Sequence, residues 1–224
     1  MKTKTLIIAH RGRTSGKYRD NTLEAFEHAI AVGVDMLEFD VRRTMDAKLI
    51  IFHDRSIRGK RLSKLTYDQI KTTLGFTPPL LSDVLALGSR VKLDIELKED
   101  GYVEDIIKLI KQACSSDQII ITSFQPGILS QVKDYAPKYD TGLVVANGLG
   151  SIKRAHSCRA DYLVLHYFWI KLGMLQLAAK AGLPCLVWAT NNPQVIHRQL
   201  SDPRIIGLIT DVPEQAIAVA KRSA

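Results

Sequence analysis

Eight short runs of aliphatic and β-branched residues alternate with amphipathic segments along the whole of this 224-residue chain. The runs lie at residues 5–10, 36–41, 91–97, 119–124, 141–146, 162–167, 184–189 and 205–210. Strands that alternate with helices form parallel β-α-β units, because each helix returns the chain to the end of the sheet where the next strand starts. Eight such units predict an α/β fold in which the strands close into a single (β/α)8 or TIM barrel.

The segments between the runs show the periodicity of helices that pack one face against a sheet. The clearest segment lies at residues 21–32, where Leu23 and Phe26 share the face opposite to the glutamates. Asp20 or Asn21 is expected to cap this helix. Further helices are expected at residues 103–113, 126–135, 171–181 and 213–221. An open doubly wound sheet is the alternative fold, but such sheets normally carry a glycine-rich turn after the first strand, which this sequence lacks.

Chain length and composition are those of an ordinary globular domain. A length of 224 residues is close to that of a complete barrel, and no linker rich in proline, glycine or serine interrupts the alternation. Hydrophobic residues make up 46% of the chain and charged residues 24%, which excludes disordered and fibrous classes. We therefore expect one domain over residues 1–224.

The formal net charge of +8 favours an anionic partner. The basic residues are spread along the chain and no base-stacking motif accompanies them, so we expect a small phosphodiester rather than nucleic acid. His10 and Arg11 interrupt the first apolar run, which is too short for a secretory signal or a stable membrane insertion. Three cysteines without C-x-x-C spacing indicate free thiols and a cytoplasmic location. The sequence indicates no oligomeric state.

Polar side chains collect at the C-terminal ends of the predicted strands, where barrel enzymes carry their active sites. Three acids lie inside two otherwise apolar strands: Glu38 and Asp40 share one face of the second strand, and Glu96 lies on the third. Buried carboxylates need a cationic partner. Three oxygen ligands without cysteine suit a divalent Mg²⁺ or Ca²⁺ better than zinc. The alternative is a structural set of salt bridges to Lys98 and Arg11.

His53 ends an additional apolar run at residues 49–52, which follows the second strand too closely for a helical crossover. The run is expected to fold back as a short hairpin, followed by a small insertion. With a two-residue turn at residues 46–47, cross-strand pairing sets His53 opposite Asp40 and beside the proposed metal ion. Taken singly, His10 and His53 are no more often catalytic than structural at such positions.

These fragments form one ordered series. The series is His10-Arg11-Gly12, Asp20-Asn21-Thr22, Glu38-Phe39-Asp40-Val41, Thr44-Met45-Asp46, His53-Asp54, Ile95-Glu96-Leu97-Lys98, Ser123-Phe124, Trp188 with Asn191, and Thr210-Asp211. Each fragment alone is weak, but in this order and spacing the chain resembles the glycerophosphodiester phosphodiesterase family of (β/α)8 barrels over nearly its whole length.

The resemblance implies a phosphoric diester hydrolase that cleaves glycerophosphodiesters to glycerol 3-phosphate and an alcohol. By the same resemblance, Glu38, Asp40 and Glu96 are the metal ligands, and His10 and His53 are the general acid and base. Two histidines near neutral pKa can activate a nucleophile and protonate the leaving alkoxide. Direct attack by water and first attack by the glycerol 2-hydroxyl both remain open.

The remaining site residues implied by the resemblance bind substrate. Arg11 resembles a phosphate-binding residue, since its planar fork suits two phosphate oxygens, and Lys98 is similar to the family's second cationic contact. Together with the metal ion they would neutralise the charge that grows on the phosphoryl oxygens. Trp188 is either a substrate contact or a wall aromatic.

The chain departs from the family pattern at several positions. Asp20 replaces the usual Glu before Asn-Thr, and Ala47 replaces the usual Gly of the Asp-Gly turn. The loop at residues 13–19 is unusually basic. The segment at residues 55–90, where the family carries an insertion involved in holding glycerol, is short and rich in Lys and Arg. These basic segments favour small anionic headgroups.

Two other functions compete with this interpretation. A lysophospholipase D-like phosphodiesterase that acts on larger lipid diesters would need an apolar channel, which Tyr167, Phe168 and Trp169 are placed to line. A catalytically silent, diester-binding barrel is the second alternative. It would not need both histidines and all three acids, which this chain retains.

Overall fold

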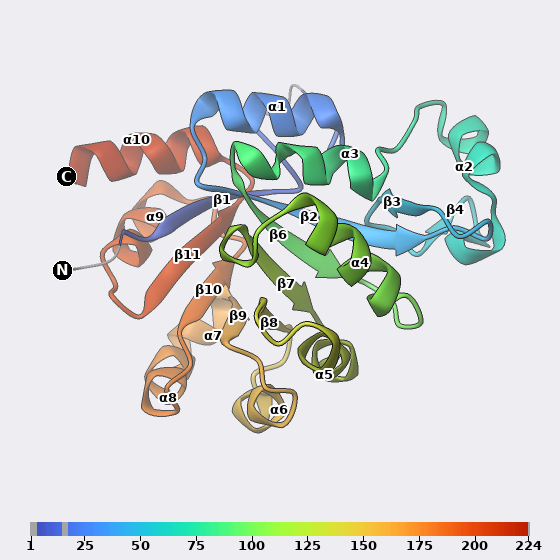
Figure 1. Cartoon of the computed structure of the whole chain (residues 1–224). Helices are drawn as coiled ribbons and strands as arrows, with labels where there is room; N and C mark the ends of the chain where they lie inside the picture. The colour runs from blue at the N-terminus through green and yellow to red at the C-terminus, as the bar shows by residue number, and fades with distance from the viewer. Residues whose placement is uncertain (1–3, 15–17, 224) are drawn as a thin grey trace.

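The computed structural model describes residues 4–14 and 18–223, so residues 15–17 of the basic loop at 13–19 lie outside the described part. In the described chain, eight parallel strands close into a barrel, since β1 pairs with β2 on one side and with β11 on the other (Figure 1). The barrel strands are β1 (Leu6–His10), β2 (Met36–Arg43), β6 (Lys92–Leu97), β7 (Ile119–Ser123), β8 (Asp140–Val145), β9 (Tyr162–His166), β10 (Cys185–Trp188) and β11 (Ile205–Thr210). The predicted (β/α)8 fold is confirmed.

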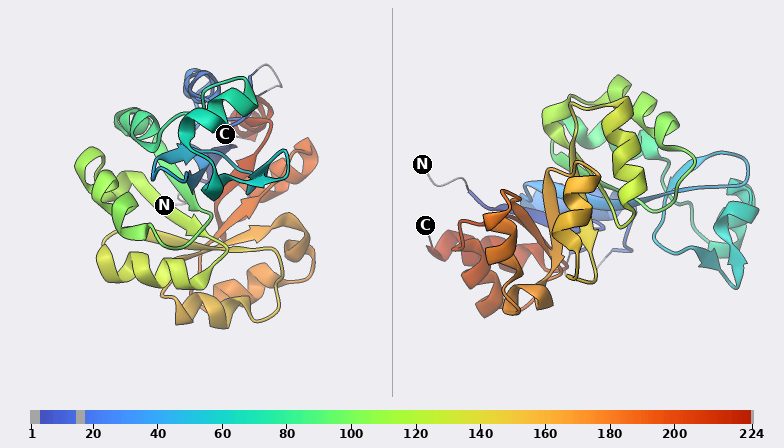
Figure 2. Two further views of the ribbon diagram at one scale, coloured as in Figure 1. Left: turned by 90° about the vertical axis from the view of Figure 1, so that its right-hand side faces the viewer. Right: turned by 90° about the horizontal axis from the view of Figure 1, so that it is seen from below.

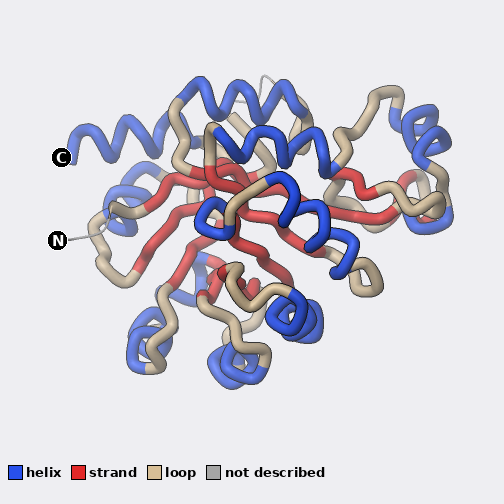
Figure 3. Tube along the Cα trace, in the orientation of Figure 1, coloured by secondary structure: helices blue, strands red, loops and turns tan. Residues whose placement is uncertain are grey.

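Helices surround the strands on the outside, as the tube view and the view along the barrel make plain (Figures 2 and 3). The α-helices are α1 (Leu23–Val32), α2 (Tyr67–Leu74), α3 (Leu81–Leu85), α4 (Val103–Ala113), α5 (Pro126–Tyr135), α6 (Ser151–Ser157), α7 (Tyr167–Lys171), α8 (Met174–Lys180), α9 (Pro193–Leu200) and α10 (Pro213–Ser223). Short 3-10 helices lie at Leu62–Lys64, Ala86–Ser89 and Ser116–Gln118. Within the described residues, no helix is both long enough and apolar enough to cross a bilayer.

The inward-facing residues of the strands change from apolar to polar toward the C-terminal end of the barrel. Ile8 is followed by His10 on β1, and Met36 by Glu38 and Asp40 on β2. The apolar members pack together as one buried cluster of Ile8, Met36, Ile120, Val144, Val164, Leu186 and Ile209. Burial of each such side chain contributes about 1.5–3 kcal/mol. The cluster therefore fills one end of the barrel and leaves the polar residues at the other.

The outward-facing residues of β1 and β2 are apolar as far as Val41. Leu37, Phe39 and Val41 on β2 are fully buried, and the Phe39 ring lies 5.7 Å from that of Phe26 on α1. Side chains along β2 thus alternate between two environments, the barrel interior and the layer of helices. This is why the acids of β2 can be read from the sequence as inward-facing.

The predicted helices are confirmed with two corrections. Thr22 caps α1, because its hydroxyl accepts the N–H of Ala25, whereas Asp20 and Asn21 bind other side chains. The helix expected at residues 171–181 begins only at Met174, as α8, because Gly173 adopts a left-handed φ of 82° before it, and Lys171 instead ends the separate short helix α7. The helices α2, α3, α6, α7 and α9 were not expected from the sequence.

The predicted hairpin forms, but its turn has three residues instead of two. β2 pairs antiparallel with β3 (Leu49–Ile51), and Thr44 N–H donates to Lys48 carbonyl across the turn at 2.9 Å. Ala47 closes the turn with a φ of 61°, the left-handed value that a turn of this length requires. The predicted pairing of His53 with Asp40 is therefore wrong by one residue, since Asp40 carbonyl accepts the N–H of Phe52.

The insertion after the hairpin projects from the barrel at the end opposite to α10 (Figures 1 and 2). It contains a two-stranded ribbon, β4 (Ser56–Ile57) with β5 (Lys60–Arg61), and the helix α2. Its own small core comprises Ile50, Ile57, Leu62, Leu65 and Ile70. The insertion is thereby a packed unit at the polar end of the barrel.

Candidate active site

A cavity of about 120 Å³ lies among the C-terminal ends of the barrel strands. Its lining comprises polar residues on one side and apolar ones on the other: His10, Arg11, Glu38, His53, Asp94, Glu96, Lys98, Thr122, Phe124, Val144, Val164, Trp188 and Ile209. Val144, Val164 and Ile209 belong to the apolar cluster of the barrel and form the floor. Of the eight residues expected in the site, all but Asp40 line this cavity, and Asp40 is fully buried beside it.

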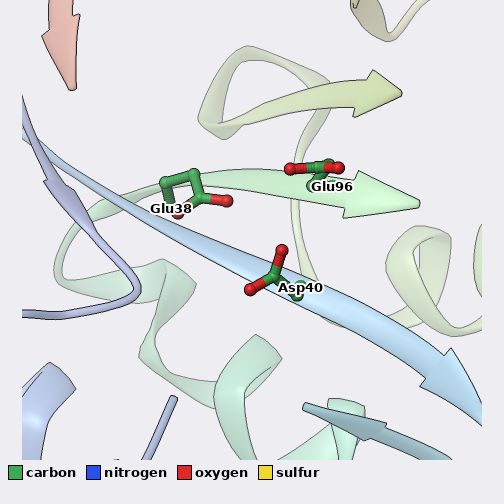
Figure 4. Close-up of side chains that lie close together, drawn as sticks. All are labelled: Glu38, Asp40 and Glu96. Carbon is green, nitrogen blue, oxygen red and sulfur yellow. The ribbon is translucent and has the colours of Figure 1, made fainter. Parts of the chain in front are cut away.

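Three carboxylates from two neighbouring strands converge at this end of the barrel (Figure 4). The in-register pairing of β2 with β6 sets Asp40 beside Glu96 and Glu38 beside Asp94. One oxygen from each of Glu38, Asp40 and Glu96 lies within 4.8 Å of the others, and all three residues are buried. The predicted set of acids is thus brought together as a cluster that could hold a metal ion.

A strained turn after β1 aims the next residues at these acids. Arg11 and Gly12 both have left-handed backbone, with φ of 56° and 67°. A Cβ at Gly12 would lie 2.5 Å from the ring of Phe26, so only glycine fits. The turn lets the backbone N–H of Arg11 donate to Glu38 Oε2 at 2.9 Å. The His10-Arg11-Gly12 fragment therefore holds one metal-ligand candidate through main chain.

Salt bridges, the alternative explanation for the acids, are present as well. Lys98 Nζ lies 2.8 Å from Asp40 Oδ1 and 2.6 Å from Glu96 Oε1. Arg11 Nε lies 3.2 Å from Asp40 Oδ2, and the amide of Asn21 donates to the same oxygen at 2.9 Å. These contacts give Asp40 two basic partners and Glu96 one. Within the described residues, Glu38 has neither a lysine nor an arginine side chain as an ion-pair partner.

The buried acids of the site can all be ionised together only if a further cation lies among them. Burial, with the neighbouring charge of Asp40, raises the pKa of Glu38 to about 8, and burial raises the pKa of Asp94 to about 7. Burial also favours protonated Asp40, but Lys98 and Arg11 outweigh it and hold the pKa of Asp40 below its usual range. With all four acids ionised, two negative charges exceed those of the basic side chains. One divalent cation on these hard oxygen donors would neutralise that excess.

His10 is fixed by a carboxylate that directly follows the last barrel strand. Its Nδ1 lies 2.7 Å from Asp211 Oδ1, and its Nε2 lies 4.0 Å from Glu38 Oε2. Asn191 donates to the other oxygen of Asp211 at 2.6 Å. Burial lowers the pKa of His10, but the hydrogen bond with Asp211 and the charge of Glu38 outweigh it and raise the pKa. Asp211 accepts two hydrogen bonds that overcome its own burial and lower its pKa to about 2.

His53 reaches the cavity from the segment that follows β3, outside the paired residues of β2 and β3. Its carbonyl accepts a hydrogen bond from Arg42 Nε at 2.8 Å, and its Nδ1 lies 2.8 Å from Asp54 Oδ1. The side chain is 41% exposed, and Asp54 is more exposed still. Burial lowers the pKa of His53 and outweighs the acids around it. The two histidines therefore enter one cavity from different elements, with pKa values shifted in opposite directions.

Aromatic side chains form the wall opposite the acids. Trp188 Nε1 donates to the Val164 carbonyl at 3.1 Å, and its ring meets Phe124 edge-on at 5.8 Å. Lys98 Nζ lies 5.7 Å from the centre of the Phe124 ring. Tyr167, Phe168 and Trp169, which were expected to line an apolar channel in a lipid-cleaving enzyme, do not line this cavity.

Sequence reasoning assigned no role to several residues that the structure connects to the site. Asp211 and Asn191 stood in the ordered series, but their link to His10 spans some two hundred residues of chain. Asp94 shares its strand face with Glu96, which was the available signal, and it accepts a hydrogen bond from Thr122 at 2.8 Å. Asn21, expected to cap α1, binds Asp40.

Comparison with known proteins agrees with the fold. The model of the glycerophosphoryl diester phosphodiesterase family matches residues 10–215. A glycerophosphodiester phosphodiesterase of Caldanaerobacter subterraneus subsp. tengcongensis is 31% identical, over 98% of this chain and 99% of its own. A glycerophosphodiester phosphodiesterase structure from Parabacteroides distasonis superposes with a TM-score of 0.85 at 24% identity over the full length of both chains. A phosphodiesterase of Oleispira antarctica, solved with the product sn-glycerol-3-phosphate, gives a TM-score of 0.85 at 21% identity over 97% of each chain. The chain belongs to the glycerophosphoryl diester phosphodiesterase family and is a phosphoric diester hydrolase.

Proposed function

We propose that this enzyme hydrolyses glycerophosphodiesters to glycerol 3-phosphate and an alcohol, and that residues 1–224 act as one domain. The observation that carries the proposal is the convergence of three buried acids, two histidines and two basic side chains on one cavity or its wall. The product bound to the relative from Oleispira antarctica supports the same substrate class. The three free cysteines, Cys114, Cys158 and Cys185, support a cytoplasmic location.

In this proposal Glu38, Asp40 and Glu96 hold a divalent cation, Mg²⁺ or Ca²⁺. The fit rests on the hard oxygen donors and on the excess of negative charge that the basic side chains leave. When bound, the cation supplies Lewis-acid polarisation of a phosphoryl oxygen. Lys98 keeps Asp40 and Glu96 in place between strands, and Arg11 holds Glu38 through its backbone N–H.

Arg11 and Lys98 bind the phosphate group. Both line the cavity, and the contact of Arg11 Nε with Asp40 fixes the guanidinium while its terminal nitrogens stay available for phosphate oxygens. A preorganised cation costs no rearrangement when negative charge develops on those oxygens. Trp188 and Phe124 then contact the carbon atoms of the glycerol, because the N–H of Trp188 is already bound to a carbonyl.

His10 and His53 carry the two proton transfers. One imidazole accepts the proton of the attacking hydroxyl, and the other donates a proton to the oxygen that leaves phosphorus. Asp211 fixes the ring of His10 so that Nε2 faces the cavity. The attacking hydroxyl belongs either to water or to the glycerol 2-position, and the pair of histidines serves both routes.

Release of glycerol 3-phosphate from glycerophosphocholine, measured with and without EDTA and after return of Mg²⁺ or Ca²⁺, tests this function. We expect release that EDTA abolishes and that one of the two ions restores. Lysophosphatidylcholine, measured in parallel, tests the lipid-cleaving alternative. If no glycerophosphodiester yields glycerol 3-phosphate with either ion present, the proposed function is wrong.

A further inference from the structure

A second depression of about 630 Å³ adjoins the cavity, and we call it the outer groove. Arg11 and His53 line both spaces, so the outer groove begins where the proposed phosphate and proton-transfer residues lie. Its far wall comes from two segments, the loop that precedes α1, with Arg19, and the segment that follows α2, with Phe76. A molecule held at Arg11 and His53 can therefore extend from the cavity into this groove.

The guanidinium of Arg19 lies over an aromatic ring in the outer groove. Its Cζ is 4.3 Å from the centre of the Phe76 ring, and its carbonyl accepts the hydroxyl of Thr22 at 2.8 Å. In the described part of the chain, its guanidinium forms no ion pair with an acid. Stacking on a ring holds a guanidinium in place but leaves the N–H groups in its plane free to bind an anion. Arg19 is thus a fixed and exposed donor.

The other charged groups of the outer groove already have partners. Both carboxylate oxygens of Asp20 bind Arg13, and the carboxylate of Asp54 contacts Nδ1 of His53. Arg11 is paired with Asp40. Among the described residues that line the outer groove, Arg19 is the charged side chain without an ion-pair partner, so the groove suits a negative group.

We propose that the outer groove binds the alcohol half of the diester and that Arg19 selects alcohols that carry a carboxylate or phosphate of their own. The inference rests on the proposed function and adds the class of the alcohol. A planar, bidentate donor suits a carboxylate or a phosphate. An alcohol whose only charge is an ammonium group gains little here, because Arg19 occupies the face of Phe76 on which such a group would otherwise stack.

Two substrates that differ by one carboxylate test the selection directly. Glycerophosphoserine is glycerophosphoethanolamine with an added carboxylate, so the ratio of their kcat/KM values isolates that group. We expect wild-type enzyme to favour the serine diester and the ratio to fall by about tenfold in Arg19→Gln, since one charge-assisted contact is lost. An unchanged ratio would overturn the inference.

Arg198→Gln is the matched control, because it removes the same charge from an exposed position on α9, away from the outer groove. The ratio should stay at the wild-type value in this variant. An equal fall in both variants would attribute the preference to the net charge of the protein and would contradict a contact in the groove.

Binding of O-phosphoserine and O-phosphoethanolamine, measured by calorimetry, separates this inference from the proposed function. We expect tighter binding of O-phosphoserine to wild-type enzyme and loss of that difference in Arg19→Gln. If the difference depends on Arg19 while no diester is hydrolysed, the proposed function fails and only the selection of an anionic group by Arg19 stands. If diesters are hydrolysed and neither the kinetic ratio nor the binding difference depends on Arg19, the groove inference alone is wrong.

Discussion

Glu38 is the site residue whose ionisation depends most on what else occupies the barrel mouth. Its side chain is buried, and the nearby charges of Asp40 and Asp94 also raise its pKa. Its hydrogen-bond donor is a neutral backbone N–H. A carboxylate in such a place takes up a proton unless a cation is close. The proposed metal ion and the proton on Glu38 therefore compete for one group.

This competition predicts that metal affinity rises with pH up to about 8, where the pKa of Glu38 lies in the metal-free protein. Below that pH the ion must displace a proton, and above it the carboxylate is already charged. The same shift makes metal-free protein less stable as pH rises from about 4.5 to about 8, because the folded state binds the proton that the unfolded state loses. Calorimetric titration with Mg²⁺ and Ca²⁺ in buffers of different ionisation enthalpy measures the proton release.

Glu38→Gln should remove the pH dependence of metal affinity and of stability that Glu38 causes. Glu96→Gln should lower metal affinity through loss of an oxygen ligand. Each variant should bind metal at least about tenfold more weakly than wild type and should lose activity by orders of magnitude with the fold intact. Glu24→Gln, on the exposed face of α1, is the control. Unchanged metal affinity in both site variants would remove these residues from the ligand set.

Asp211 positions His10 without lining the cavity itself. Asp211→Asn should lower kcat by about tenfold to a hundredfold with a smaller effect on KM. Because Asp211 helps to raise the pKa of His10, the limb of the pH profile that His10 controls should move to lower pH. A merely structural role would lower activity with the pH profile unchanged, and that result would contradict the assignment. Asp54→Asn, beside the other histidine, is the comparison.

At the scale of elements, the hairpin between β2 and β3 shows how a turn can set the position of a distant functional group. Ala47 adopts left-handed backbone because the three-residue turn requires it, although alanine pays a steric cost there. The turn fixes the register that ends with Phe52 on Asp40, and His53 follows directly. The element is thus strained at one end and functional at the other.

Ala47→Gly should therefore stabilise the protein by about 0.5–1 kcal/mol, since relief of the left-handed strain exceeds the added freedom of the unfolded chain. Ala31→Gly, at an exposed position within α1, is the opposite control and should destabilise by about 1 kcal/mol. Urea denaturation of the two variants and wild type gives the free energies of unfolding. A loss of stability in Ala47→Gly would mean that the turn stores no strain.

The same elements explain what the sequence could and could not predict. The barrel strands and the inward face of Glu38 and Asp40 were predictable, because each depends on alternation within a single short segment. The break at Gly173 and the register of the hairpin depend on left-handed backbone, which residue identity suggests only weakly. Residues paired across the barrel, such as His10 with Asp211, depend on closure of the whole sheet, and no local pattern encodes that contact.

At the scale of the whole molecule, charge and cavity shape act together on substrate choice. The chain carries a net charge of +8, and its polar site lies at the end of the barrel where the basic insertion projects. A positive surface raises the encounter rate of anionic substrates. At 0.1 M salt this attraction is largely screened at distances beyond about 10 Å. The apolar wall at the site is limited to the floor of the cavity and the ring pair of Trp188 and Phe124.

We therefore expect glycerophosphoinositol and glycerophosphocholine to show higher kcat/KM than lysophosphatidylcholine. An acyl chain gains about 0.8 kcal/mol per methylene only where it is buried, and the exposed aromatics Tyr167 and Phe168 lie outside the cavity. The advantage of glycerophosphoinositol should shrink as ionic strength rises, because its attraction to the enzyme is electrostatic, whereas burial of an acyl chain would not weaken in salt. Measurement of all three substrates at low and high ionic strength separates the two contributions. A higher kcat/KM for the lysolipid at both ionic strengths would show that an apolar surface outside the cavity takes part in binding, and would make lipid diesters the better substrates.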